Sequence, residues 1–334
     1  MKILVTGGEG FIGSHIVERL CELKHHVMTL DNHDTYGLLT TEQLRKIHKW
    51  RQRNWAPAVI KHRGTVTDAD TLLRIFQWRP EVIIHLASYP RAKLVNNNPL
   101  LGVNNIIDGT INLLQHSKNF GVKRFVFVSS SMIYGHFEDG VKESADTKPI
   151  NIYGEAKLAA ERFCKHFQQF SGVEYVIARP SGVYGPGDIP DRVVTKFFDQ
   201  AINNHKITVH KGINKVDFTY VTDAAEGIIQ CALHPGAANL SFNITSGEGT
   251  SLESVARYIR DIAESRSEIS IEGGNSLYPS RGGLDITRAR DILGYAPRVS
   301  LLKGLNHYYD WVQEMNPPTD PGEDIMNKQD RDRW

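Results

Sequence analysis

The sequence predicts an α/β protein built on a Rossmann-type doubly wound parallel sheet, with a smaller C-terminal α/β substrate lobe. Two observations carry this prediction. Short apolar runs of strand length alternate with helix-compatible stretches from residue 2 to about residue 180, a pattern typical of a parallel sheet with helices on both faces. The first apolar run is also followed at once by a glycine-rich turn and a helical stretch, the order found in dinucleotide-binding βαβ units.

The glycine-rich turn is the clearest local motif. The apolar run Lys2–Val5 leads into Thr6–Gly13, which reads TGGEGFIG, and a helical pattern then continues to about residue 23. Gly7 permits a tight turn, Gly10 lets a pyrophosphate approach the backbone, and Gly13 lets helix and strand pack closely. The free N–H groups at the helix start would face the phosphates.

An acid follows the second predicted strand at the expected place. The apolar run Val27–Leu30 ends in Asp31, 18 residues past Gly13, close to the roughly 20 expected for a ribose-binding carboxylate. Asp31 would accept hydrogen bonds from ribose hydroxyls and repel a 2′-phosphate. No Lys or Arg lies between Val27 and Leu44, so NAD is favoured over NADP. The alternative is an ordinary strand–turn–helix with a capping acid.

Composition excludes several classes of function. The net charge of +1 does not indicate a basic surface for nucleic acid, and no apolar run is long enough to predict a membrane span. A strand that begins at residue 2 leaves no room for a signal peptide. Three scattered cysteines, and histidines without HExxH or CxxC spacing, predict a reducing cytoplasm and no metal site.

The later part of the chain completes the alternation and then loosens. Further strands are expected at 58–62, 82–87, 124–128 and 174–178, and helices at 69–76, 103–118 and 153–170. Residues 1–180 are predicted to form the NAD-binding domain, to which parts of the later chain return. Residues 181–315 would form the substrate lobe, with strands near 207–210, 218–221 and 241–244 and helices near 192–203, 222–233, 251–265, 285–293 and 301–315. Residues 316–334 would form a polar tail.

A basic stretch interrupts the first half. Thr41–Trp55 carries many Lys, Arg and His residues in a helix-compatible pattern. We expect a helical insertion with its positive face in water. The alternative is a helix that faces phosphate or a partner.

A tyrosine and a lysine four residues apart form the second chemical signal. Tyr153 and Lys157 would share one helix face, about 6 Å apart along the axis. A buried ammonium beside a phenol favours the phenolate and lowers a pKa that starts near ~10, so Tyr153 could take a proton from a sugar hydroxyl near neutral pH. Such a pair also occurs by chance on amphipathic helices. Two neighbouring features favour a catalytic pair over a chance pair. They are the glycine-rich turn and the serine run Ser129–Ser131 at the end of a predicted strand.

With these features together, the chain resembles the extended short-chain dehydrogenase/reductase family, in particular its NAD-dependent nucleotide-sugar epimerase/dehydratase branch. The resemblance covers about residues 1–313. The matching pieces are Thr6–Gly13, His85–Ala87, Val128–Gly135, Tyr153–Lys157, Arg179, Val183–Pro186, Asp217–Asp223, Leu293–Tyr295 and Pro297.

The resemblance implies a catalytic set and a reaction. Ser130 matches the family's catalytic Ser or Thr and would hydrogen-bond the sugar O4, with Tyr153 as base and Lys157 supporting it and reaching the nicotinamide ribose. The implied chemistry is hydride removal from C4, a transient 4-keto sugar, and hydride return to the other face. The residues expected to bind cofactor are Gly7, Gly10, Phe11, Ile12, Gly13, Asp31, Asn32, Leu86, Ala87, Ser88, Tyr153 and Lys157.

The two positions after Ser130, which are Ser131 and Met132, separate the reaction subclasses of the family. Dehydratases of this branch carry an acid two residues before the tyrosine of the Tyr134-Gly135 pair, and 3,5-epimerising relatives carry a cysteine there. Met132 occupies that position and cannot move a proton. A plain C4 epimerase, which needs neither group, remains. We read Ser129 as a small residue that ends a strand, and Ser131 in the same way, although Ser131 could also touch substrate.

The sequence departs from the family pattern at three places. Thr65-Val66 stands where the family has Asp-(Ile/Val/Leu), so the adenine contact that the resemblance implies is weakened or remade. Gly182 replaces an Asn and Val216 replaces an Arg, so two contacts implied on the diphosphate side are absent. The residues expected to contact substrate are Arg91, Ser131, Lys215 and Arg281. For Arg281 a phosphate contact and a surface-loop role are both open; for Arg91 a carboxylate or phosphate contact competes with simple solvation.

Three functions therefore stay open. The first is an NAD-dependent nucleotide-sugar C4 epimerase that acts on a nucleotide-diphosphate sugar. The second is a net keto-sugar reductase or dehydrogenase of the same fold that uses free NAD(P)H. The third is a non-catalytic NAD-binding protein, because fold does not fix function. The family resemblance also implies a homodimer that pairs through the helices near 103–118 and 153–170.

Overall fold

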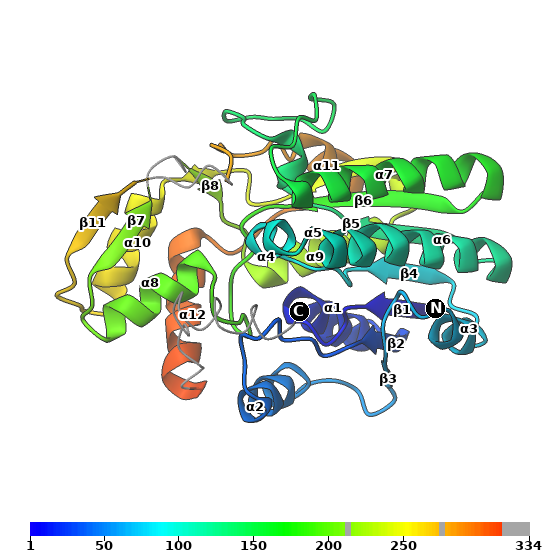
Figure 1. The fold of residues 1–334 in the computed structure, drawn as a ribbon, viewed down its shortest axis with the longest axis horizontal. Helices are drawn as coiled ribbons and strands as arrows, with labels where there is room; N and C mark the ends of the chain where they lie inside the picture. The colour runs from blue at the N-terminus through cyan, green and yellow to red at the C-terminus, as the bar shows by residue number, and fades with distance from the viewer. Residues whose placement is uncertain (211–214, 274–277, 316–334) are drawn as a thin grey trace.

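The computed structural model describes residues 1–210, 215–273 and 278–315. Its centre is a seven-stranded parallel sheet with the strand order β3-β2-β1-β4-β5-β6-β9 (Figure 1). The order reverses between β1 and β4, which places a crevice outside the carboxyl ends of these strands. The strands are β1 (Lys2–Thr6), β2 (His26–Asp31), β3 (Ile60–Arg63), β4 (Val82–His85), β5 (Arg124–Val128), β6 (Glu174–Pro180) and β9 (Leu240–Ile244).

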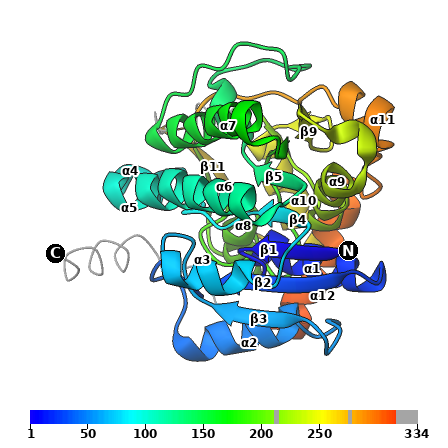
Figure 2. The ribbon, with the colours of Figure 1, turned by 90° about the vertical axis from the view of Figure 1, so that its right-hand side faces the viewer.

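Helices cover both faces of this sheet because alternate strand residues point to opposite sides. Leu4 packs on the side of α3 (Ala69–Phe76), α6 (Gly109–Phe120) and α7 (Ile152–Ser171), whereas Ile3 and Val5 pack on the side of α1 (Phe11–Glu22), α9 (Val221–Leu233) and α11 (Thr287–Leu293). Figure 2 shows the two layers on either side of the sheet. The predicted Rossmann-type fold class is confirmed.

A smaller body lies beyond the carboxyl edge of the sheet. It contains the helices α8 (Val193–Ile202), α10 (Leu252–Ile262) and α12 (Leu301–Met315), together with two short two-stranded sheets. These sheets pair β7 (Ile207–His210) with β11 (Ile269–Glu272), and β8 (Val216–Asp217) with β10 (Gly249–Thr250). A separate aromatic-rich core holds this body together, with Phe197, Phe198, Tyr308 and Trp311 among its members.

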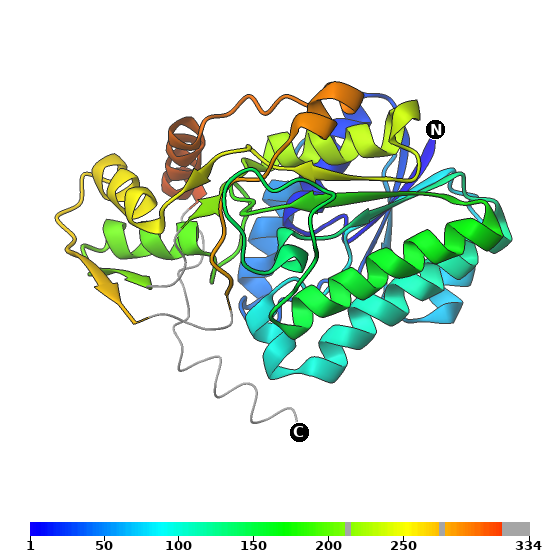
Figure 3. The same ribbon diagram turned by 90° about the horizontal axis from the view of Figure 1, so that it is seen from above.

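The chain crosses between the two bodies more than once. The segment after β6 enters the smaller body through α8, and α9 and β9 then return to the large sheet. Figure 3 shows α6 and α7 side by side along the face of the larger body. The remaining short elements are α2 (Thr41–Arg51), α4 (Ala92–Asn97), α5 (Pro99–Val103), η1 (Asn104–Asp108), η2 (Ser131–Tyr134) and η3 (Pro235–Ala237).

Two expected elements are wrong in detail. The helix expected over 103–118 is interrupted by a π-turn, η1, where the Thr110 hydroxyl donates to the Ile106 carbonyl at 2.6 Å and competes with the backbone ladder. The strand expected over 218–221 is instead β8, followed by a bridge between Tyr184 and Tyr220. Val221 already begins α9.

Among the described residues, no helix is long and apolar enough to cross a membrane. The tail predicted for 316–334 lies outside the described residues.

Candidate active site

The glycine-rich turn leaves the start of α1 open to an anion. Gly7 has a φ of +69°, and its N–H donates to the Leu30 carbonyl at 2.8 Å, so the turn is tied to β2. A Cβ on Gly13 would lie 2.1 Å from the Gly7 carbonyl oxygen, so only glycine fits there. Gly10 caps α1 without a side-chain hydrogen bond, and no acid lies in the first turn. These uncapped N–H groups suit a pyrophosphate.

Asp31 lies beside this turn at the end of β2. Its carboxylate accepts hydrogen bonds from the Glu9 N–H at 3.1 Å and the His33 N–H at 2.9 Å. These two bonds fix the carboxylate next to the start of α1 and leave lone pairs for ribose hydroxyls. The residues present therefore fit a dinucleotide with an unphosphorylated adenosine ribose.

The ends of the neighbouring strands complete the crevice. The N–H groups of Leu86 and Ala87 both donate to the Thr6 carbonyl at 3.0 Å, which joins the end of β4 to β1. The hydroxyl of Ser88 is buried and has no hydrogen-bond partner among the described residues. Asn32 is exposed, and its Oδ1 accepts from the Asp34 N–H. An orphaned buried hydroxyl at this edge is consistent with a ligand-facing role for Ser88.

Ser130, Tyr153 and Lys157 come together as the sequence predicts. Ser130 follows β5 and caps η2, with its Oγ accepting the Met132 N–H at 3.2 Å. Tyr153 and Lys157 lie in the first two turns of α7, whose N-cap Asn151 accepts from the Gly154 N–H at 2.8 Å. Ser130 lies close enough to Tyr153 for its hydroxyl to favour the phenolate and so to act toward a lower pKa of Tyr153.

The lysine is buried beneath the tyrosine. Its Nζ donates to the Val128 carbonyl at 2.9 Å and lies 5.9 Å from the Tyr153 ring centre and 4.9 Å from that of Phe127. Burial lowers the pKa of Lys157 to about 7, with the charge of Glu161 acting in the opposite direction.

The expected depression of the tyrosine pKa is not what this structure shows. Burial raises the pKa of Tyr153 above its ordinary value, and the charge of Arg192 and the hydrogen bond from Ser130 act against that rise. The sequence indicated only Lys157 as the compensating charge. Arg192 lies in the segment between β6 and α8, directly before α8 begins, and no recognisable motif or spacing marks it.

A buried ion pair holds α7 against the sheet. Arg179 of β6 makes a two-pronged pair with Glu161, with N···O distances of 3.0 and 2.7 Å. Its other terminal nitrogen donates to the Tyr134 hydroxyl at 2.8 Å and to the Glu143 carbonyl at 3.0 Å. Because Tyr134 ends η2 and Glu161 lies one turn past Lys157, this network fixes the segments of Ser130 and Lys157 relative to each other.

The residues expected to contact substrate divide into two groups. Ser131 is fully buried, and its hydroxyl donates to the Ser181 hydroxyl at 3.0 Å, so it is committed to the protein interior. Lys215 pairs with Asp139 at 2.6 Å on the surface. Arg281 adjoins Lys215 through a backbone bridge, and its Nε is buried without a hydrogen-bond partner among the described residues. Arg281 is thus the better candidate for an anion contact.

Of the two alternatives for Arg91, simple solvation is wrong. Arg91 is buried and makes a carboxylate contact within the protein, with Asp191 at 2.6 Å. Its Nε has no hydrogen-bond partner among the described residues. Because Asp191 lies one residue before Arg192, this pair fixes the loop that brings Arg192 toward Tyr153.

The basic stretch is only in part a solvated helix. Arg45, Lys46 and Lys49 of α2 are exposed, as expected. Arg51 is buried, and its guanidinium donates to the Gly187 carbonyl at 3.0 and 2.8 Å and to the Glu9 carbonyl at 3.0 Å. Arg51 therefore ties the glycine-rich turn to the loop after β6, a role that no sequence pattern indicated.

Residues 3–245 match the family described as the NAD dependent epimerase/dehydratase family. The chain belongs to this family. Among its relatives, an uncharacterized UDP-glucose epimerase of Bacillus subtilis, YtcB, is 31% identical over 94% of this chain and 99% of that protein. UDP-glucuronic acid decarboxylase 3 of Arabidopsis thaliana is 32% identical over 91% of this chain and 87% of that protein.

Solved structures of the family have the same fold. The UDP-glucuronic acid 4-epimerase from Bacillus cereus, in complex with UDP-glucuronic acid and NAD, has a TM-score of 0.87 at 26% identity, covering 94% of this chain and 100% of that one. The UDP-glucose 4-epimerase from Thermotoga maritima, with UDP-glucose, has a TM-score of 0.84 at 28% identity, covering 95% and 100%. These findings confirm the predicted family, NAD as its cofactor, and an NAD-dependent nucleotide-sugar epimerase as the enzyme class.

Proposed function

We propose that this family member inverts C4 of a uridine-diphosphate hexose or hexuronate and retains its NAD through each turnover. The observation that carries the proposal is the contact between the Ser130 and Tyr153 hydroxyls, above the buried Lys157, at the carboxyl edge of the sheet. The 4-epimerases among the solved relatives, with their UDP-sugars and NAD, support the substrate class.

Bound NAD would lie across the start of α1 and Asp31 and would supply a nicotinamide that accepts and returns the C4 hydride. The protein's part is to move the O4 proton. The Ser130 hydroxyl would hydrogen-bond O4, take the O4 proton and give its own proton to the Tyr153 oxygen. The same relay in reverse would return a proton to O4 of the inverted sugar. Atoms balance over the cycle, because one hydride and one proton leave the sugar and both come back.

Nearby charges shift the pKa of Tyr153 and so the pH at which it can accept a proton. Burial alone keeps the phenol protonated, because its anion is poorly solvated. The positive charge of Arg192 favours the phenolate. The Lys157 Nζ lies 5.9 Å from the Tyr153 ring centre, and a positive charge there would act in the same direction. The charge of Arg192 acts on Tyr153, and a guanidinium on this side of the site favours a sugar that carries a carboxylate.

The proposal is tested by identifying the nucleotide released from denatured, freshly purified protein. Bound NAD(H) close to one equivalent is expected, because an epimerase regains its oxidised cofactor in every cycle. UDP-hexoses and UDP-hexuronates are then incubated with the protein without added cofactor, and C4 inversion is followed by chromatography. Empty protein that consumes NAD(P)H with keto-sugars would show the net reductase instead.

Decarboxylation is a second candidate because several relatives are UDP-glucuronic acid decarboxylases at 30–32% identity. Oxidation of a hexuronate at C4 makes a β-keto acid, which can lose carbon dioxide after the same first step. The product decides between the two: a UDP-hexuronate epimer supports inversion, and a UDP-pentose with released carbon dioxide supports decarboxylation.

We also propose that the protein is a homodimer in the cytoplasm. The paired helices α6 and α7 form one face of the larger body (Figure 3), and exposed apolar side chains lie at its ends, with Leu100 72% and Phe170 59% exposed. Light scattering that gives a monomeric mass would refute the dimer. Three unpaired cysteines support a reducing compartment.

A further inference from the structure

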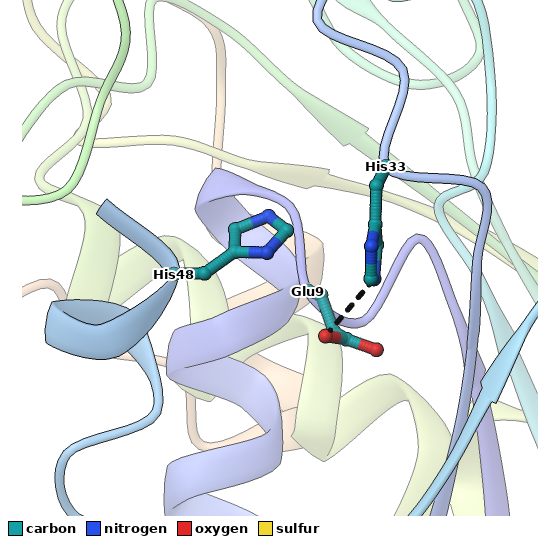
Figure 4. A group of neighbouring side chains, drawn as sticks. All are labelled: Glu9, His33 and His48. Carbon is teal, nitrogen blue, oxygen red and sulfur yellow. Dashed lines mark ion pairs between the residues drawn. The ribbon is translucent and has the colours of Figure 1, made fainter. Parts of the chain in front are cut away.

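Three side chains with metal-binding atoms meet beside the glycine-rich turn. Glu9 comes from the turn itself, His33 from the loop after β2, and His48 from α2. Figure 4 shows the three side chains converging, and their ligand atoms all lie within 4.8 Å of one another. No sequence motif predicts this group, because its members are 24 and 15 residues apart along the chain.

The closest pair is placed as two ligands of one ion would be. The Nε2 atom of His33 makes an ion-pair contact with Oε2 of Glu9 at 3.1 Å, the dashed line in Figure 4, and this buried nitrogen has no hydrogen-bond partner among the described residues. Two ligand atoms of a tetrahedral zinc ion, with bonds of about 2.0–2.1 Å, lie about 3.3 Å apart. The ring centres of His33 and His48 are 4.7 Å apart with an interplanar angle of 76°, so both rings border the same space.

The carboxylate of Glu9 is buried and would be stabilised by a positively charged partner. Glu9 is 4% exposed, and its oxygens accept from the Thr29 hydroxyl at 3.3 Å and the Gln52 amide at 2.7 Å. Both donors are neutral, and the facing His33 Nε2, 3.1 Å from Oε2, supplies a positive charge only when the ring is protonated. A buried carboxylate is costly without a counter-charge. The Gln52 bond also fixes the carboxylate, in the way that outer residues orient metal ligands.

Three exposed cations, Arg45, Lys61 and Arg63, line the rim of the same pocket. Arg51 is buried beside the group, and its guanidinium donates to the backbone carbonyls of Glu9 and Gly187 rather than to the Glu9 carboxylate. Lys61 in addition donates to Oε1 of Gln52 at 2.9 Å. Solvent and salt screen these exposed cations, whereas a metal ion would contact the buried Glu9 oxygen directly.

We propose that Glu9, His33 and His48 bind one divalent transition-metal ion of the zinc class, with water in the remaining position. Two imidazoles and one carboxylate are a ligand set that zinc takes in proteins. The site is separate from Ser130 and Tyr153 and does not depend on the proposed reaction.

The site adjoins the cofactor pocket through the backbone. The N–H groups of Glu9 and His33 are the two that hold the Asp31 carboxylate. His33 has a φ of +58°, a conformation that non-glycine residues rarely adopt. A metal ion would therefore hold both segments that flank the ribose-binding acid.

Metal binding is measured on untagged, chelator-treated full-length protein by calorimetric titration with Zn²⁺ and by the visible spectrum of added Co²⁺. One equivalent is expected, with a four- or five-coordinate Co²⁺ spectrum and a rise in the thermal unfolding midpoint on Zn²⁺ addition. Glu9→Gln, His33→Ala and His48→Ala should each weaken binding more than about 100-fold, and Gln52→Leu about 10–100-fold.

His26→Ala is the matched control, because His26 is exposed at the opposite end of β2. It should bind Zn²⁺ as the unaltered protein does. Circular dichroism verifies that each variant is folded, and Glu9→Gln keeps the side-chain shape if the alanine variants do not fold. Binding of less than one equivalent by the unaltered protein, or equal binding by folded Glu9→Gln, would overturn the proposal.

Discussion

Replacing the buried lysine by methionine is predicted to stabilise the nucleotide-free protein. Burial lowers the pKa of Lys157 from 10.5 to about 7, and one pKa unit corresponds to about 1.4 kcal/mol. At pH 7, where the folded lysine is about half deprotonated, its burial therefore costs about 4 kcal/mol. Methionine removes this cost but leaves the Val128 carbonyl without the lysine donor at 2.9 Å, which costs about 1–3 kcal/mol. Lys157→Met should thus raise the free energy of unfolding by about 2 kcal/mol at pH 7.

The pH dependence of this gain is the sharper test. Between pH 7 and 10.5 the unfolded chain keeps a proton on Lys157 that the folded chain has lost, so the stability of the unaltered protein rises with pH. The slope from this one group approaches about 1.4 kcal/mol per pH unit. Methionine does not titrate, so the advantage of Lys157→Met should shrink and then reverse as the pH rises toward about 9 or 10.

Urea unfolding of nucleotide-free protein at pH values of about 7, 8 and 9 measures the difference. Lys165→Met is the control, because Lys165 is exposed on the same helix and its replacement should give no pH-dependent gap. A Lys157→Met advantage that stays constant with pH, or a variant that is less stable at neutral pH, would refute the assignment of the pKa to burial. The same variant should lose epimerase activity.

Other predictions follow from the site. Asp31→Ala should weaken NAD binding about 10–100-fold, measured by fluorescence titration, because ribose hydroxyls lose a charged acceptor; unchanged affinity would contradict the placement of the ribose. Glu161→Gln should lower the free energy of unfolding by about 3 kcal/mol, because its arginine partner stays buried and charged, whereas exposed Glu155→Gln should change little. Arg192→Met should move the rise of kcat to higher pH, because a cation that favours the Tyr153 phenolate is lost; an unshifted pH profile would count against it.

The large sheet and the helix that carries Tyr153 and Lys157 could be predicted because their signals are local. The apolar run Val82–Ile84 is buried in β4 as a parallel strand should be, and Leu301–Met315 forms α12 over the predicted range. The serine, tyrosine and lysine were also found in sequence, because a strand end and a helix start put them at one edge of the sheet.

What sequence missed depends on contacts between distant segments. Arg51 is one basic residue among several in α2, and only the carbonyls of Glu9 and Gly187 distinguish it. Arg91 pairs with Asp191, 100 residues away, so its burial could not be read from its neighbours. The tyrosine pKa was predicted with the wrong sign because the depth of burial outweighs the nearby charges.

The central claim is that the C4 hydride leaves the sugar and returns to it within one enzyme. A UDP-hexose or UDP-hexuronate labelled with deuterium at C4 tests this most directly, with the product analysed by mass spectrometry and nicotinamide absorbance followed throughout. The account predicts an inverted sugar that keeps its deuterium at C4, without accumulation of NADH and without added cofactor. Loss of the label to water, or reduced cofactor formed in proportion to product, would contradict it.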